Sequence, residues 1–255
     1  AKKASAQSVM AALVVGIALT VLTTSLSNSI VRWMQVAPEI RDAAAMYFRI
    51  LYIPMLFRTM SILFGTVLRA VGDTQTPMRV GVKVNLLNVV FNFLLIYPRR
   101  TVSLFGTSFF LWGAGWGING AAAASAVAYT YGGIAIALRL WRHPDISPKG
   151  QRFASDWLVL KPCLKVAFPN MLQRFGTSLC YVAIASMINA LGDVSAAAHT
   201  IANTVESLFY IPGWGMQTAA ATLAGNALGA KDGKRLYSLA GTFLPLEIGL
   251  MVFSG

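Results

Sequence analysis

The sequence predicts an all-α polytopic membrane protein with about seven transmembrane helices. Its 255 residues are 56% hydrophobic but only 12% charged, which is about half the charged fraction of a typical soluble domain. The mean hydropathy is +0.61. Apolar runs of roughly 20 residues recur along the chain, and a helix of that length crosses a hydrocarbon core of about 30 Å. These observations favour a chain held in the bilayer by its own helices.

The apolar runs divide the chain into about seven predicted spans separated by polar connections. Basic residues are more frequent in alternate connections, and the positive-inside rule places those connections in the cytoplasm. Ala1 is therefore expected inside and Gly255 outside. The predicted spans are residues 7–27, 46–68, 77–97, 115–138, 160–190, 196–228 and 236–255. The basic residues that set this orientation are Lys2, Lys3, Arg69, Arg79, Arg139, Arg142, Lys149, Arg152, Lys161, Lys165, Lys231, Lys234 and Arg235.

A tight reversal is predicted between the second and third spans, in residues 68–78 (LRAVGDTQTPM). Gly72 suits the left-handed conformation that ends one helix. Thr76 is a candidate cap for the next helix, and Pro77 suits its first turn.

The longest polar connection, residues 139–159, contains prolines and a glycine and is predicted to be a cytoplasmic linker between two helical bundles. Residues 1–138 then form part of a first bundle with about four transmembrane helices. Residues 160–255 form part of a second bundle with about three. The connection 98–114 is predicted to be an extracellular loop. Pro54 falls inside the second span and is expected to kink it.

Composition and motifs argue against several other functions. The formal net charge of +12 would suggest nucleic-acid binding in a soluble protein, but here membrane topology accounts for the basic residues. The sequence contains no metal-binding, phosphate-binding or nucleophile-elbow motif, so neither an enzyme nor a metal site is predicted. Cys163 and Cys180 both lie in apolar sequence and are expected to remain free thiols.

Polar side chains at mid-membrane depth are the candidate functional residues. Asn88 and Asn92 lie one helical turn apart in the third span, so both amides project from one face near the bilayer middle. From the residues alone, two interpretations stay open: hydrogen bonds between helices, worth roughly 1 kcal/mol each, or a binding site. Arg58 lies at mid-depth in the second span. It is interpreted either as a structural residue or as a group facing a wet cavity.

A second candidate group lies in the later spans. Glu206 is about ten residues into the sixth span, where a carboxyl group is costly enough to be a functional candidate. Arg174 lies at a similar depth in the fifth span and is expected to reach Glu206, as a structural ion pair or at the wall of a substrate cavity. Tyr210, Met171 and Phe175 are expected to line the same cavity, since aromatic and Met surfaces adapt to many ligands.

Several motifs in a consistent order carry a resemblance to a known family. These are the reversal at 68–78, the Asn-rich helix after it, the small-residue run at 120–125, and residues 223–232 (LAGNALGAKD). Over nearly its whole length the chain resembles the multidrug and toxic compound extrusion (MATE) transporters. The resemblance implies two bundles of six helices, with this chain opening just before the family's third helix and stopping within its ninth.

The resemblance also implies an ion site in the first bundle. Asn88, Asn92 and Ser125 match positions that hold a cation or a proton in many members of the family. Two departures are evident: Asn92 is not an acid, and the helix that supplies an Asp to the site is absent from this chain.

The implied function is secondary active antiport. The protein would export amphipathic organic compounds or drugs across the plasma membrane (the bacterial inner membrane) in exchange for Na⁺ or H⁺, with no other cofactor. Its partners would be a small organic substrate and the lipid bilayer, and not nucleic acid, while the sequence leaves the oligomeric state undefined. Two alternatives stay open. One is a lipid-linked oligosaccharide or peptidoglycan-precursor flippase of the same superfamily, which mid-depth Arg58 and Arg174 favour; the other is a structural membrane subunit without transport.

Overall fold

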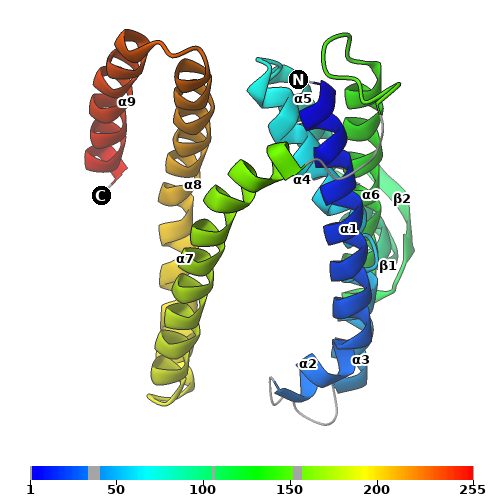
Figure 1. Cartoon of the computed structure of the whole chain (residues 1–255). Helices are drawn as coiled ribbons and strands as arrows, with labels where there is room; N and C mark the ends of the chain where they lie inside the picture. The colour runs from blue at the N-terminus through cyan, green and yellow to red at the C-terminus, as the bar shows by residue number, and fades with distance from the viewer. Residues whose placement is uncertain (1, 34–40, 105–106, 152–156, 255) are drawn as a thin grey trace. The chain divides into compact units, whose positions relative to one another are not determined.

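The computed structural model describes residues 2–33, 41–104, 107–151 and 157–254, and these residues form nine helices and one two-stranded ribbon (Figure 1). The all-α prediction is confirmed. The helices are α1 (Lys2–Ser25), α2 (Ser27–Trp33), α3 (Arg41–Tyr52), α4 (Met55–Ala70), α5 (Gln75–Ile96), α6 (Gly117–Arg142), α7 (Trp157–Asn189), α8 (Asp193–Gly229) and α9 (Gly233–Ser254), and the strands are β1 (Pro98–Leu104) and β2 (Thr107–Ala114).

The chain divides into two compact units, Ala1–Val159 and Leu160–Gly255, which are described separately below. The assignment of residues 1–138 and 160–255 to two bundles of a transporter, with 139–159 as a linker, stays a prediction.

In the first unit, α6 packs against α3, α4 and α5, and α1 packs against α4. Glycines allow the closest approaches. A β-carbon at Gly16 of α1 would lie 2.7 Å from Leu56 Cδ1, and one at Gly133 of α6 would lie 2.6 Å from Phe57 Cβ. The apolar core lies at the predicted cytoplasmic end, where α1 and α5 begin and α4 and α6 end. Its buried members are Val9, Ala12, Phe64, Leu68, Val80, Ile136, Leu140 and Ile146.

The second predicted span is broken into α3 and α4, which meet at an angle of 40°. Pro54 lies at the break. Proline has no backbone N–H and its ring clashes with the preceding turn, so it interrupts a helix there. The N–H of Arg58 donates to the Pro54 carbonyl at 3.1 Å and starts the second half of the span. The kink expected from Pro54 is confirmed.

The reversal between α4 and α5 forms as predicted, except for its cap. Gly72 has φ +93°, and the N–H of Asp73 donates to the Leu68 carbonyl at 3.0 Å, which closes the end of α4. The carboxylate of Asp73, and not the side chain of Thr76, caps α5: Asp73 Oδ1 accepts the Thr76 N–H at 3.0 Å. Thr76 instead lies in the first turn together with Pro77.

Opposing effects act on the pKa of Asp73. Partial burial raises it, but the hydrogen bonds from Thr76 and the positive charges of His143 and Arg139 together outweigh burial, and the pKa lies below its ordinary value. The C-terminal end of α6 therefore stabilises the charged form of the cap.

The turn between α8 and α9 repeats this geometry. Lys231 takes the left-handed position at φ 56°, and the N–H of Asp232 donates to the Ala227 carbonyl at 3.0 Å. Asp232 Oδ1 then accepts the Arg235 N–H at 3.0 Å. The same sequence of helix end, left-handed residue and Asp cap thus occurs once in each unit.

Residues 143–151, which the sequence placed in the linker, pack onto the first unit. Ile146 is 1% exposed and belongs to the core, and Pro148 is also fully buried. Ser147 Oγ donates to the carbonyl of Trp141, near the end of α6, at 2.8 Å. This segment is held by apolar burial and is not an extended tether.

The predicted extracellular loop at 98–114 contains a regular hairpin. β1 and β2 pair antiparallel, with Thr101 opposite Phe110 and Leu104 opposite Thr107. Together the strands contain Thr, Val, Phe and Trp, and these β-branched and aromatic residues suit a pleated ribbon, so the predicted loop is partly ordered as strands.

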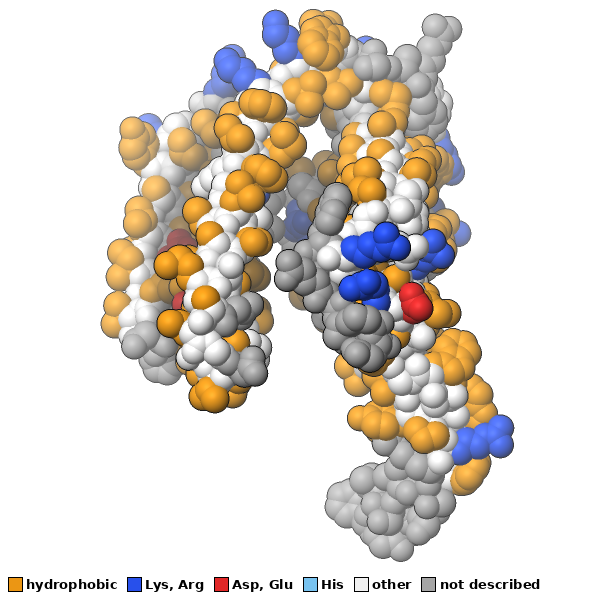
Figure 2. Space-filling view, turned by 90° about the horizontal axis from the view of Figure 1, so that it is seen from below, with side chains coloured by type: hydrophobic (Ala, Val, Ile, Leu, Met, Phe, Trp, Pro, Cys, Tyr) orange, Lys and Arg blue, Asp and Glu red, His pale blue; other side chains and the backbone are white. Residues whose placement is uncertain are grey.

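In the second unit, α8 and α9 pack together as a helical hairpin, while almost every side chain of α7 is exposed. Cys163 and Cys180 are free thiols, as expected. Within the described residues, α1, α5 and α6 are each long and apolar enough to span a membrane, and α3 with α4 qualifies as one bent span. Hydrophobic side chains cover much of the helix surfaces (Figure 2), as expected of helices that face lipid.

Candidate functional site

The structure brings together the three residues predicted to form an ion site, here called the amide cluster: Asn88, Asn92 and Ser125. Asn92 Nδ2 donates to Asn88 Oδ1 at 3.0 Å, and Asn88 Nδ2 donates to Ser125 Oγ at 3.0 Å. The chain of hydrogen bonds runs along one face of α5 and crosses to α6. All three side chains are partly buried.

The depth of the cluster follows from helix geometry. Asn88 lies 13 residues after Gln75, the first residue of α5, which corresponds to about 20 Å of helix. Small side chains bring α6 close to α5: Ala122 and Ala124 are fully buried, and a β-carbon at Gly120 would meet the backbone of Leu95. Packing of this kind lets polar groups on facing membrane helices come within hydrogen-bonding distance.

One oxygen of the cluster has no partner. Asn92 Oδ1 is buried and accepts no hydrogen bond from the residues that the structure describes, whereas the other amide groups of the cluster are engaged. A buried acceptor left unpaired costs about 1–3 kcal/mol, so a group that supplies positive charge or a proton donor would be stabilised there. Amide and hydroxyl oxygens are ligands for hard cations, while none of the three side chains titrates near neutral pH.

The amide cluster supplies only part of a cation's ligand set. Among the residues that the structure describes, His, Cys, Asp and Glu side chains form no group of three or more that could hold a metal ion. Cation binding by the cluster stays a prediction, and such an ion would need further oxygen ligands.

The candidate residues of the second unit lie on two helices. Glu206 and Tyr210 lie one turn apart on the same face of α8. In the part of the chain that the structure describes, Arg174 on α7 forms no ion pair with Glu206. Met171 and Phe175 of α7 are more than half exposed. Their expected role at a substrate cavity stays a prediction.

Sequence analysis missed two polar contacts within the first unit. The Arg58 guanidinium lies over the ring of Tyr129 on α6, 5.1 Å from its centroid. Asn119 Nδ2, near the start of α6, contacts Met46 Sδ of α3 at 3.8 Å. A mid-depth arginine and a tyrosine at similar depth on another span were the available signal for the first contact.

The fold and the cluster define a polytopic helical membrane protein with polar groups inside its first bundle. Comparison with known families narrows this class. The family description MatE matches residues 1–94 and 169–254, and the chain therefore belongs to the MatE family. It is a multi-pass membrane protein of a family of transporters, whose bacterial members lie in the inner membrane.

Curated relatives carry multidrug-resistance names. The chain is 27% identical over 227 residues to the probable multidrug resistance protein NorM of Thermotoga maritima, covering 88% of this chain and 47% of the relative. It is 26% identical over 225 residues to the probable multidrug resistance protein YoeA of Bacillus subtilis, covering 87% and 46%. The chain thus spans about half the length of these relatives.

Solved structures share the fold over nearly the whole chain. The crystal structure of MATE in complex with MaD3S aligns with a TM-score of 0.84 at 22% identity, covering 98% of this chain and 53% of that chain. The outward-facing conformation of a multidrug resistance MATE family transporter aligns with a TM-score of 0.81 at 20% identity, again covering 98% and 53%. These alignments include α7, α8 and α9, and the expectation of about seven transmembrane helices fits them.

Proposed function

We propose that the protein exports amphipathic organic compounds in exchange for Na⁺ or H⁺. Membership of the MatE family supports this, as do the multidrug-resistance names of the relatives. Solved structures with similar folds include complexes described as containing MaD3S and Br-NRF, which are compounds bound by those proteins. Small organic compounds are accordingly the proposed substrates.

The observation that carries the proposal is the unpaired Asn92 Oδ1 in the amide cluster. An oxygen ligand near mid-membrane suits Na⁺, because unpaired carbonyl groups replace water around the ion. If the coupling ion is instead a proton, the amide cluster cannot carry it, and Glu206 is the proposed carrier.

The proposed transport cycle rocks two helical bundles so that a central cavity opens to each side in turn. Arg174, Glu206, Tyr210, Met171 and Phe175 are the proposed cavity residues of the second bundle. In the first bundle, the break at Pro54 supplies a bend within one span, a feature that suits helices that change their tilt.

The proposal is tested with the full-length protein in proteoliposomes, using a fluorescent amphipathic cation as cargo. Asn88→Ala removes both hydrogen bonds of the cluster. We expect it to raise the coupling-ion concentration that gives half-maximal efflux by about 10- to 100-fold. Asn28→Ala, at an exposed amide on α2, is the matched control and should behave as the wild type. Equal ion dependence in both variants would remove the cluster from coupling.

Glu206→Gln separates the two coupling ions. If protons drive efflux through Glu206, the variant loses its pH dependence but remains folded. If Glu206 is structural, the pH response persists, and any loss appears in the midpoint of thermal unfolding. Expression, thermal stability and efflux are therefore recorded together for each protein.

A flippase of lipid-linked, diphosphate-bearing precursors is the second candidate function. It is favoured by Arg58, which is exposed at mid-depth and whose contact is an aromatic ring. Translocation of a lipid-linked diphosphate by the same proteoliposomes, without dye efflux, would select this function over drug export.

A further inference from the structure

A pocket of about 320 Å³ lies between α4, α5 and α6 of the first unit. It is adjacent to the amide cluster but distinct from it. Asn85 of the pocket precedes Asn88 by about one turn on α5, and Tyr129 follows Ser125 by about one turn on α6. Asn85 and Tyr129 therefore both lie closer than the amide cluster to the predicted cytoplasmic side. The residues that line the pocket include Arg58, Ser61, Gly81, Val84, Asn85 and Tyr129.

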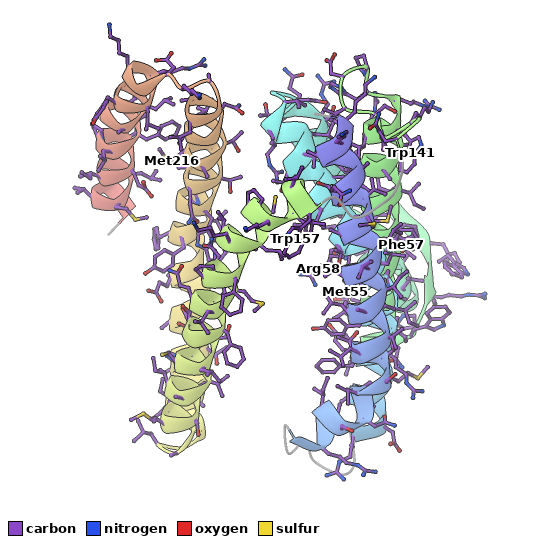
Figure 3. All side chains as sticks on the ribbon, in the orientation of Figure 1. Met55, Phe57, Arg58, Trp141, Trp157 and Met216 are labelled. Carbon is purple, nitrogen blue, oxygen red and sulfur yellow. The ribbon has the colours of Figure 1, made fainter. Side chains whose placement is uncertain are left out.

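Arg58 is the only charged residue lining this pocket among the described residues. It lies 12 residues before Ala70, the last residue of α4, which places it about 18 Å from that end of the span. The central carbon of the guanidinium lies over the ring of Tyr129, 5.1 Å from its centroid (Figure 3 labels Arg58 on α4). An arginine at this depth is costly unless it meets water, an anion or suitable acceptors.

The described helices around the pocket carry no counter-charge. The sequences of α1, α4, α5 and α6 contain no Asp or Glu. In the described part of the first unit, the acids are Asp42 at the start of α3, Asp73 in the α4–α5 turn, and Asp145 after α6. All three lie at or just beyond the ends of helices, and none of them lines the pocket.

The geometry leaves the guanidinium able to bind an oxyanion. A cation–π contact engages the charge of the guanidinium, and the edge that carries its N–H donors can still meet another group. That edge matches a carboxylate or phosphate, which accepts two parallel hydrogen bonds. The Ser61 hydroxyl and the Asn85 amide add donors to the same pocket, while Val84 and the Tyr129 ring add apolar walls.

We propose that this pocket binds the oxyanion group of an amphipathic compound and that Arg58 determines the preference for anionic over neutral ligands. The bound compound is a cargo only if the proposed export function holds, whereas binding itself does not depend on transport. The oxyanion has two possible sources, a freely diffusing organic acid or a phosphate carried by a lipid. Because phospholipid phosphates lie at the membrane surface, the depth of Arg58 favours the organic acid.

The test compares two probes of nearly equal shape, 1-naphthoate and neutral 1-naphthamide. Equilibrium binding is measured to the full-length protein in nanodiscs of phosphatidylcholine. We expect the wild type to bind naphthoate roughly 10- to 100-fold more tightly than naphthamide, as hydrogen bonds to a charged group imply. Arg58→Gln should abolish this preference and leave naphthamide binding unchanged. Arg49→Gln, at an exposed arginine of α3 that does not line the pocket, should keep it.

Gly81→Leu tests the location of binding with Arg58 intact. A β-carbon at Gly81 meets no atom within 4 Å, so the longer side chain can enter the pocket without displacing the backbone. We expect it to weaken binding of both probes. Addition of phosphatidylglycerol identifies the source: competition with naphthoate indicates a lipid phosphate, and absence of competition indicates an organic acid.

Equal affinity of the wild type for the two probes would overturn the proposal without any variant. Retention of the preference in Arg58→Gln would also overturn it, as would naphthoate binding that is unaffected by Gly81→Leu. If only the proposed export function is wrong, dye efflux is absent but the wild type still prefers naphthoate to naphthamide.

Discussion

Replacement of Gly133 by Ala tests the closest helix contact of the first unit. Gly133 is buried on α6, and a β-carbon there would lie 2.6 Å from Phe57 Cβ and 2.7 Å from Phe57 Cα of α4 (Figure 3 labels Phe57). Nonbonded carbons rarely approach closer than about 3.4 Å, so α4 and α6 must separate by roughly 0.8 Å to accept the methyl group. Because the obstructing atoms include backbone, a change of rotamer cannot relieve the clash.

The expected cost follows from this overlap. Overpacking at a tight contact costs about 1–3 kcal/mol, and the better helix propensity of Ala returns up to about 1 kcal/mol. We expect a net loss of about 1–2 kcal/mol, which lowers the midpoint of thermal unfolding by several degrees. The measurement is thermal unfolding of the purified protein in one detergent.

Gly81→Ala is the matched control for this experiment. It makes the same substitution within a helix of the same unit, but its β-carbon meets nothing within 4 Å. It should be as stable as the wild type or slightly more stable. If Gly133→Ala proved as stable as Gly81→Ala, the close packing of α6 on α4 at Phe57 would be refuted.

Three further predictions concern the ends of the helices. Ile146→Ala should lower the free energy of unfolding by about 2–4 kcal/mol, because the side chain is 1% exposed in the core. Ile134→Ala, at a side chain that is 45% exposed, is the control and should cost far less. Equal thermal midpoints of the two variants would mean that residues 143–151 do not pack as described. Asp73→Asn should lower stability by about 0.3–1 kcal/mol near neutral pH, because Asn can still accept the Thr76 N–H but lacks the charge that favours a helix N-terminus. The pKa of Asp73 in the folded protein is depressed, so its contribution to the free energy of unfolding is present above the unfolded pKa of about 3.9 and is lost as pH falls through the folded pKa. The difference in stability between variant and wild type should therefore close below about pH 4. A difference that widened there would contradict the depressed pKa. Lys231→Gly should raise stability by about 1 kcal/mol, because φ 56° is unfavourable for a side chain, and an unchanged melting midpoint would show that the turn is not strained.

Local chemistry explains which features the sequence predicted. Gly72 and Pro54 act within their own segments, through a permitted positive φ and a missing N–H, so the reversal and the kink were visible without tertiary information. The cap was assigned to Thr76 instead of Asp73 because both residues are good caps and helix boundaries are uncertain by a residue or two. The stacking of Asn88 and Asn92 followed from their spacing of one turn, whereas Ser125 entered through the family resemblance.

Other features depend on how distant segments meet. Arg58 and Tyr129 are brought together by the rotation of α4 and α6 about their axes, which no local pattern specifies. The burial of Ile146 likewise requires the completed end of the helix bundle, since a short polar connection containing prolines otherwise suggests a linker. The hairpin at 98–114 shows a third limit: strand-forming residues among apolar helices are easily taken for a loop.

Ion-coupled export is tested most directly by imposing one gradient at a time on proteoliposomes that contain the full-length wild-type protein. An inward Na⁺ gradient is applied at constant pH, and an inward proton gradient is applied without Na⁺, while efflux of a fluorescent amphipathic cation is followed. We predict that at least one gradient drives the dye out against its own concentration gradient, and that an ionophore for that ion stops the movement. Dye that moves only down its own gradient under every condition would contradict ion-coupled export.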